Sequence, residues 1–144
     1  MKAALLAPLL ALSLMASPAS VRLEDANFDG HRDILLCTSP GAPNDYYAYF
    51  LYDPLAGDYR HAPAFDALEA SPVFDARLGL IRCSARESAA TYGEYCYQMD
   101  EQGQPQLIER REIAYESETS RRVTQYMLLN GAMQKTREWV ETIE

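Results

Sequence analysis

Apolar residues are distributed along this chain in two ways, as one long stretch at the start and as short runs afterwards. Residues 3–16 are apolar except for Pro8 and Ser13, Lys2 precedes them, and small residues follow up to position 19. This layout is typical of a secretory signal peptide that is cleaved after position 16 or 19. The alternative is an apolar N-terminal helix that packs on the domain. We expect residues 1–19 to be removed on export and residues 20–144 to form a single domain.

The apolar stretch also predicts how the chain relates to the membrane. It is too short to span the hydrocarbon core comfortably, which takes about 20 apolar residues. Residues 14–17 resemble a bacterial lipoprotein box, but Ser17 stands where the lipid-bearing cysteine must be. The sequence therefore predicts a periplasmic protein with no membrane span and no lipid anchor.

From residue 33 onwards, short apolar runs bounded by turn signals predict β-strands, and helical periodicity is hard to find. Asp33–Cys37 is one such run, and Tyr46–Tyr52 is aromatic on both alternating faces, which is typical of a central strand covered on both sides. Residues 62–75 contain two prolines, which predicts a loop with at most one helical turn around Ala67. Further strands are predicted at Leu78–Ser84, Glu94–Met99 and Leu107–Tyr115. The fold class is therefore all-β.

The clearest local signal lies near the end of the chain, where Asn130-Gly131 separates two alternating runs. This dipeptide is preferred in type I′ hairpins because both central residues need positive φ. A two-residue turn also sets the register of the two strands. It predicts the facing pairs Leu128–Met133, Tyr126–Lys135 and Arg122–Trp139, the last as a guanidinium stacked on an indole.

The strongest chemical signal is the pattern D-x-N-x-D-G-x-x-D, in which Gly30 follows the third oxygen-bearing side chain. Alternate side chains of a tightly curled loop point inward, and an all-oxygen site of this kind suits Ca²⁺ before Mg²⁺. An EF-hand would need Glu at the twelfth loop position, where this chain has Leu36. The predicted ligands are Asp25, Asn27, Asp29, the carbonyl of His31, and Asp33. We expect calcium to have a structural role, and the alternative is an acidic turn that binds no metal.

Charge narrows the choice of partner. The full chain has a net charge of −8, and removal of Lys2 with the signal peptide leaves 12 basic against 21 acidic residues, or −9. A nucleic-acid binder needs clustered positive charge, and an anionic lipid surface would repel this chain. The balance favours a basic protein partner or a cationic ligand.

Three cysteines remain after export, Cys37, Cys83 and Cys96, so two can pair and one is left over. Three pairings are possible from the sequence alone. If the strands at 78–84 and 94–99 pair antiparallel, Cys83 and Cys96 face each other at the root of the intervening loop. A disulfide there would brace residues 88–93 as a pre-ordered projection. The alternative is an ordinary hairpin loop with Cys83 buried and reduced.

Catalytic arrangements are sparse in this sequence. The two histidines are His31, inside the predicted calcium loop, and His61, beside Ala62-Pro63. No Ser/His/Asp order, histidine-rich metal spacing or glycine-rich phosphate loop stands out. Five of the ten tyrosines lie between positions 46 and 59 and are predicted to pack in a sheet. We expect a binding protein and not an enzyme.

Four segments together carry a family resemblance: Val21–Asp33, Tyr46–Pro54 with Gly57, Ser71–Asp75, and Ser88–Gly93. Their order resembles that in FG-GAP-like periplasmic proteins similar to the PliI-type lysozyme inhibitors and to immunity proteins against secreted peptidoglycan hydrolases. The resemblance covers about residues 21–115. It implies a small antiparallel β-propeller-like domain, a calcium ion in the first loop, and inhibition by plugging the active-site cleft of a hydrolase.

The resemblance also implies where the partner binds. The loop at residues 88–93 resembles the serine–tyrosine loops that several lysozyme inhibitors insert into the enzyme, and Tyr92 is the expected anchor. The candidate partner-binding residues are Arg86, Glu87, Ser88, Thr91, Tyr92 and Tyr95. The partner is expected to be a lysozyme or another peptidoglycan hydrolase. The alternative function is a calcium-stabilised envelope binding or adhesion module that recognises a glycan or a protein.

Overall fold

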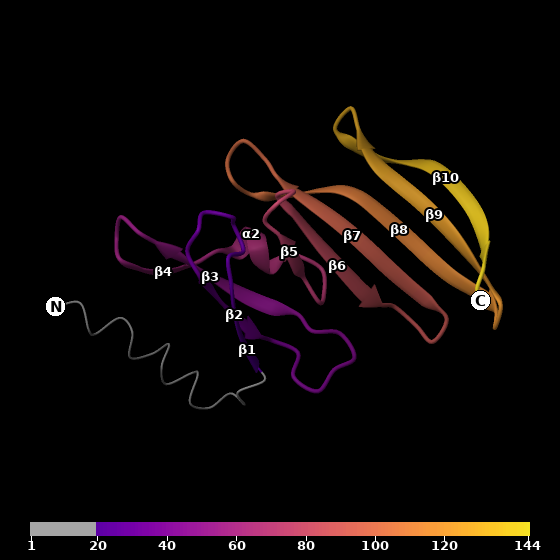
Figure 1. The fold of residues 1–144 in the computed structure, drawn as a ribbon, viewed down its shortest axis with the longest axis horizontal. Helices are drawn as coiled ribbons and strands as arrows, with labels where there is room; N and C mark the ends of the chain where they lie inside the picture. Colours follow the sequence, from indigo (N-terminus) through magenta and orange to yellow (C-terminus); the bar gives the residue numbers. More distant parts are fainter. Residues whose placement is uncertain (1–19) are drawn as a thin grey trace.

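The computed structural model describes residues 20–144, which form two antiparallel sheets and one short helix (Figure 1). A four-stranded sheet has the order β1-β2-β3-β4, and a six-stranded sheet has the order β10-β9-β8-β7-β6-β5. The all-β prediction is confirmed, and both sheets are open, so the propeller-like arrangement is not shown by these strands. Within the described residues, no helix is long and apolar enough to cross a membrane. The predicted signal peptide, residues 1–19, lies outside the described part.

Within each sheet, every strand pairs with its neighbours in the sequence. The four-stranded sheet contains β1 (Val21–Glu24), β2 (Asp33–Cys37), β3 (Tyr47–Asp53) and β4 (Asp58–His61). The helix is α2 (Pro63–Asp66). The six-stranded sheet contains β5 (Val73–Asp75), β6 (Leu80–Arg86), β7 (Thr91–Met99), β8 (Pro105–Ser117), β9 (Ser120–Leu129) and β10 (Ala132–Thr142). Short turns between neighbours explain why every pairing is antiparallel.

One apolar core joins the two sheets. Leu35 and Tyr49 point into it from the four-stranded sheet, Phe65 from α2, and Ile81 and Tyr97 from the six-stranded sheet. Four of these side chains are almost completely buried and Tyr97 is 8% exposed, and each contributes about 1.5–3 kcal/mol through burial of apolar surface. The core thus fixes the β5–β7 end of the larger sheet against the smaller one.

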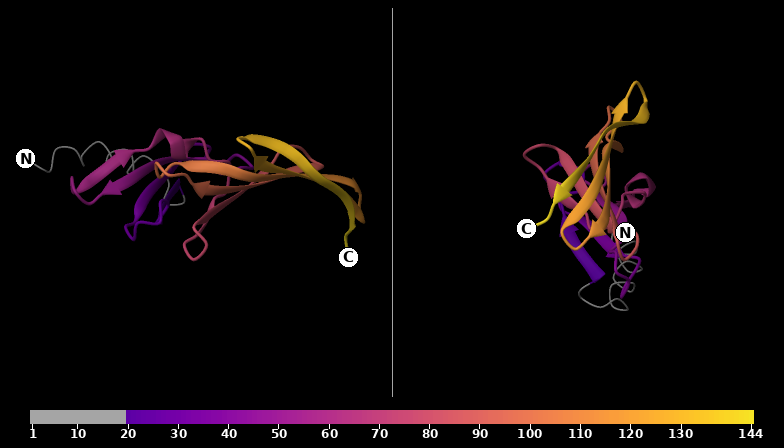
Figure 2. Two further views of the ribbon diagram at one scale, coloured as in Figure 1. Left: turned by 90° about the horizontal axis from the view of Figure 1, so that it is seen from above. Right: turned by 90° about the vertical axis from the view of Figure 1, so that its right-hand side faces the viewer.

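The other end of the six-stranded sheet extends beyond this core. Strands β8, β9 and β10 curve away from the four-stranded sheet (Figure 2). Ile113 and Val123 are nevertheless buried, at 6% and 2% exposure, and they belong to no part of the main core. The register places Tyr92, Ile113, Val123 and Trp139 side by side across β7 to β10 on one face. A second, smaller apolar cluster therefore supports the extension.

Several predicted elements are found where the sequence placed them. The run Asp33–Cys37 is β2, and the one helical turn, α2, ends immediately before Ala67. The predicted strand at Tyr46–Tyr52 is β3, which lies centrally between β2 and β4. Only one of its faces meets the core, because the side chain of Phe50 on the other face is half-buried outside it.

The Asn130-Gly131 turn is confirmed. Asn130 has a φ of 52° and Gly131 a φ of 81°, so both central residues are left-handed, as a type I′ turn requires. The turn sets the register of the first strand pairs of β9 and β10. The predicted pairs Leu128–Met133 and Tyr126–Lys135 face each other.

The third predicted pair of this hairpin is wrong because of a β-bulge. The register shifts between Lys135 and Arg137, so Trp139 faces Val123 and Arg122 faces Val140. An extra residue in one strand moves every later side chain relative to the partner strand. The guanidinium that lies over the Trp139 ring is therefore that of Arg137, 4.8 Å from the ring centroid.

The predicted disulfide between Cys83 and Cys96 is not formed, and the register explains why. Cys83 faces Tyr95, and Cys96 faces Arg82, so the two thiols project from opposite faces of the sheet. Both cysteines and Cys37 are free. Cys83 lies in the core, where burial raises the pKa of its thiol to about 12.

We predict that the purified protein carries three free thiols, none of them in a disulfide, and that their accessibility differs. Cys96 and Cys37 are half-buried and should react with an alkylating reagent under native conditions, whereas buried Cys83 should react after unfolding. Alkylation without reductant, followed by peptide mass spectrometry, measures each site. A cross-linked peptide pair containing Cys83 and Cys96 would contradict the observed register.

Candidate functional site

The loop between β1 and β2 is tied to the rest of the four-stranded sheet by Asp33. This side chain is completely buried. Its two carboxylate oxygens accept hydrogen bonds from the backbone N–H groups of Ala26, at 2.8 Å, and of Tyr52, at 2.9 Å. Because the Ala26 N–H is buried and the Tyr52 N–H is half-buried, Asp33 supplies acceptors that stabilise both the loop and its contact with β3.

The other acidic residues of this loop shape its backbone. The carboxylate of Asp25 accepts hydrogen bonds from the N–H groups of Asp29, at 3.0 Å, and Gly30, at 2.8 Å. Asp29 in turn accepts one from the N–H of His31 at 2.9 Å. Gly30 has a φ of 86°, which glycine adopts without strain. The result is a compact loop that concentrates carboxylate oxygens.

The donor set of this loop fits a hard cation in part. The Asn27 amide nitrogen donates to Asp29 at 3.2 Å, while the Asn27 Oδ1 atom is buried without a hydrogen-bonding partner. Burial raises the pKa of Asp33 above its usual range, and the nearby charges of Asp29 and Asp25 raise it further. A bound cation would satisfy the amide oxygen and offset this repulsion.

The predicted calcium ligands are not equally available to bind a cation. Within residues 20–144, no cluster of three or more His, Cys, Asp or Glu side chains is arranged to hold a metal ion. A site here would therefore depend on the Asn27 amide and the His31 carbonyl as well as on Asp25 and Asp29. The carboxylate of Asp33 is engaged by backbone N–H groups, and its part as a ligand stays a prediction.

The tip of the β6–β7 hairpin, residues 87–90, is exposed and ordered by one hydroxyl group. We call it the Ser88 tip. The Ser88 oxygen accepts hydrogen bonds from the N–H groups of Ala90, at 3.2 Å, and Thr91, at 3.1 Å, and lies 2.7 Å from the Thr91 hydroxyl. The Ser88 N–H donates to the Thr91 carbonyl at 3.2 Å. These local bonds give the tip a defined shape without a disulfide.

Two neighbouring segments hold the Ser88 tip at its base. The side chain of Asn44, from the loop before β3, accepts from the Arg86 N–H and donates to the Arg86 carbonyl, both at 2.8 Å. On the other side, the Tyr115 N–H donates to the Ala90 carbonyl at 2.8 Å. The hairpin is therefore connected to both sheets at the point where it projects.

Tyr92, the expected anchor, lies on β7 and not in the tip itself. Its ring packs edge-on against Tyr115 at a centroid distance of 5.7 Å, and the guanidinium of Arg86 lies 6.0 Å from it. Tyr115 is 40% exposed and forms part of this aromatic pair. The sequence analysis missed Tyr115 because it lies on β8, and the β7–β8 register brings it beside the tip.

Glu87 and Tyr95 lie apart from this pair. Tyr95 lies an odd number of positions after Tyr92 on β7. Because side chains of a strand alternate between its two faces, the Tyr95 side chain projects from the opposite face. The Tyr95 hydroxyl donates to the Glu87 carboxylate at 3.0 Å, and burial, followed by this bond, raises the Tyr95 pKa. A Cβ atom on Gly93 would lie 2.5 Å from that hydroxyl, so glycine makes room for the ring. The structure therefore divides the six predicted residues between two faces.

A pocket of about 360 Å³ lies on the outer face of β5 to β8. Arg82, Glu94 and Cys96 line it, and Arg111 contacts Glu109 at its wall at 2.7 Å. The residues that line the pocket carry both signs of charge, and no histidine is among them. The sequence analysis had no signal for it, because its lining residues alternate along four different strands.

Comparison with known proteins gives one structural neighbour to report. No protein-family model matches the chain, and no curated protein sequence matches it either. The chain is similar to a solved structure described as a Xanthomonas type IV secretion system related protein, with a TM-score of 0.67 and 16% sequence identity. The similarity covers 82% of this chain but only 58% of that protein. At this identity it shows a shared fold.

We predict that removal of calcium destabilises the protein. Chelation should lower the melting temperature by several degrees, which corresponds to about 1 kcal/mol for a domain of this size, because the loop carboxylates then repel one another. Thermal unfolding followed by circular dichroism, with and without a chelator, measures the shift. Asn27→Ala should abolish the calcium response.

Asp100→Asn is the matched control for this experiment. Asp100 accepts backbone N–H bonds from Gln102 and Gln104 in the β7–β8 turn, as Asp25 does in the β1–β2 loop, but lies outside the predicted site. Its variant should keep the full calcium response. A wild-type melting curve indifferent to the chelator would contradict the calcium prediction.

Proposed function

We propose that this chain is a periplasmic inhibitor or immunity protein that blocks the active site of a lysozyme or related peptidoglycan hydrolase. The observation that carries the proposal is the Ser88 tip, which is exposed, is bonded at its base to segments of both sheets, and has its turn ordered by the Ser88 hydroxyl. A pre-ordered tip loses little conformational entropy on entering a cleft. We also propose that the two sheets form the propeller-like fold of the inhibitor family.

The chemistry of the tip suits the active site of a glycoside hydrolase. Such enzymes use a pair of carboxyl groups on either side of the scissile bond. The hydroxyl groups of Ser88 and Thr91 and the guanidinium of Arg86 are hydrogen-bond donors beside the tip, and donors of this kind bind carboxylates well. Tyr92 and Tyr115 add an aromatic surface of the kind enriched at the centre of interfaces.

Charge supports the choice of partner. The exported chain has a net charge of −9, and lysozymes are typically basic. Opposite net charges accelerate association more than they strengthen the final complex. The proposed interaction therefore combines electrostatic attraction at long range with hydrogen bonds at the tip.

The proposed calcium ion has a structural role in this picture. The loop of residues 25–33 contacts β3 at Tyr52, near the end of that strand, whereas Asn44 contacts the hairpin base just before β3 begins. Metal loop and tip are thus separated by the length of β3. Calcium would stabilise the small sheet on which the base of the tip depends, without touching the partner.

The direct test is lysis of peptidoglycan by a panel of lysozymes and peptidoglycan-cleaving glycosidases, with and without equimolar protein, in calcium. We expect lysis by one enzyme of the panel to be lost. No effect on any enzyme would contradict the inhibitor proposal and would favour an envelope binding module.

Tyr92→Ala should weaken inhibition at least 10-fold, about 1.4 kcal/mol, because it removes the aromatic contact beside the tip. Inhibition constants measured by titration of lysis give the change. Tyr59→Ala is the matched control, since Tyr59 is also half-buried in an edge-on tyrosine pair, with Tyr52 at 5.3 Å, but lies on β4. Equal loss in both variants would show that the effect is general destabilisation.

A further inference from the structure

A second hairpin tip lies beside the Ser88 tip. The β7–β8 ladder ends at the pair Thr91–Ala114, and the next contact is the hydrogen bond from the Tyr115 N–H to the Ala90 carbonyl. Strand β8 then continues to Ser117 and turns into β9 at the same end of the sheet as the β6–β7 turn (Figure 1). We call residues 116–120 the Glu118 tip.

The two tips are ordered by the same device. In the Glu118 tip, the Ser117 hydroxyl accepts from the Thr119 N–H at 3.2 Å and lies 2.8 Å from the Ser120 hydroxyl. Ser88 makes the equivalent contacts two and three residues ahead of it. Both turns are exposed and lie outside the core, so these hydrogen bonds act only within each turn. Each tip is thus held in one shape at the surface.

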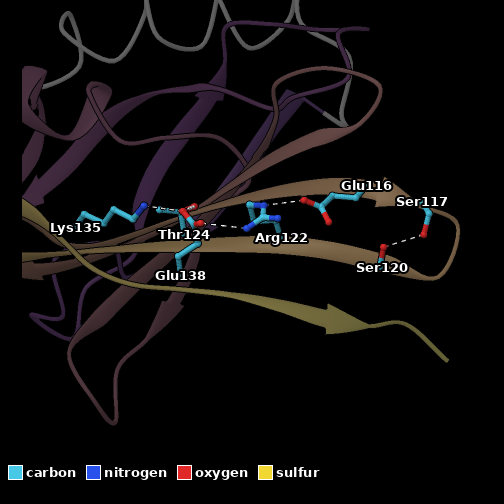
Figure 3. A network of polar contacts seen from close by, with 7 residues as sticks. All are labelled: Glu116, Ser117, Ser120, Arg122, Thr124, Lys135 and Glu138. Atoms are coloured by element: carbon cyan, nitrogen blue, oxygen red, sulfur yellow. Dashed lines mark hydrogen bonds and ion pairs between the residues drawn. The ribbon is translucent and has the colours of Figure 1, made fainter.

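Ion pairs and the end of β10 also support the Glu118 tip. Arg122 bonds Glu116 at 2.7 Å and Glu138 at 3.1 Å, and Lys135 bonds Glu138 at 2.6 Å, in a row along the strands that leads to the tip (Figure 3). The Thr119 carbonyl accepts from the N–H of Ile143 at 2.8 Å. The turn is therefore tied to β9 by an ion pair and to the residue that follows β10 by a backbone hydrogen bond.

Unpaired negative charge gathers at this end of the sheet. Glu116 is neutralised by Arg122, but Glu118 is exposed and has no hydrogen-bonding or ion-pair partner within residues 20–144. Asp45, in the loop that supports the hairpin base, likewise forms no ion pair within that range. No lysine lies in either tip. A charge held at an ordered, projecting turn suits contact with a basic surface.

We propose that the Glu118 tip is a second contact element of the same partner-binding surface. Glu118 would meet basic side chains on the rim of the partner's cleft, while the Ser88 tip enters the cleft and Tyr115 packs between the two. This inference rests on the proposed function, because it names how a basic hydrolase is held beside its active site. It assigns a role to a hairpin that the sequence analysis did not select.

The test compares two charge reversals of the same size, Glu118→Lys and Glu101→Lys. Glu101 is also exposed and without an ion-pair partner within residues 20–144, but it lies in the β7–β8 turn. That turn is at the other end of the 13-residue strand β8, about 40 Å away at 3.3 Å per residue. This separation is several Debye lengths at physiological salt. The two variants therefore change the net charge equally and differ only in whether the charge near the two tips is reversed.

Association and dissociation rates with the lysozyme that wild-type protein inhibits in the panel give the readout, at low and at physiological salt. We expect Glu118→Lys to raise the dissociation constant at least 10-fold, mainly through slower association, and to flatten the salt dependence. Glu101→Lys should change the dissociation constant less than 2-fold, because Glu101 lies away from the proposed contact surface. Tyr115→Ala should raise the dissociation rate, with melting curves checked for each variant.

The outcomes separate the two proposals. If wild-type protein inhibits a lysozyme and both charge reversals have equal effects, the Glu118 tip is not a contact element and the inhibitor proposal stands. If wild-type protein binds and inhibits no enzyme of the panel, the inhibitor proposal fails and this inference fails with it. A large, local effect of Glu118→Lys would support both.

Discussion

The antiparallel register of the six-stranded sheet is the constraint on which the rest of the molecule depends. It decides which side chains share a face, since side chains alternate along every strand. The pairing of Cys83 with Tyr95 sends two cysteines to opposite faces, and the pairing of Tyr92 with Ile113 brings Tyr115 beside the Ser88 tip. A shift of one residue would move the core side chains to the surface and separate the two hairpin tips.

Order at the projecting tips comes from short polar side chains, where a disulfide was expected. Ser88 and Ser117 each satisfy backbone donors inside their own turn, and Asn44 bonds both backbone groups of Arg86 across the gap between the sheets. Each neutral hydrogen bond contributes about 1 kcal/mol or less at the surface. These hydrogen bonds matter because they select one conformation of an exposed loop, without a contribution from the cysteine thiols.

The sequence predicted features that depend on neighbouring residues and missed those that depend on distant ones. The apolar run of β2 and the Asn130-Gly131 turn are local signals, and both are confirmed. The bulge after Lys135 is not encoded by any glycine or proline, so the Arg122–Trp139 pair was misplaced. Tyr115 carried no signal, because its neighbour Tyr92 is on another strand. Calcium binding and the partner remain predictions.

The contacts of the β1–β2 loop and of the Ser88 tip lie at opposite ends of β3. Asp33 bonds the β1–β2 loop to Tyr52 near the end of this strand, whereas the Asn44 contact lies just before its start. Because Tyr47 and Tyr49 of β3 are buried in the core between them, the strand can transmit a loss of order from the loop to the hairpin base. Binding of a cation would then strengthen partner binding through the population of folded protein and not through contact. Near the melting temperature, calcium-bound and calcium-depleted protein should therefore differ in the concentration of folded protein, while each folded molecule binds equally tightly.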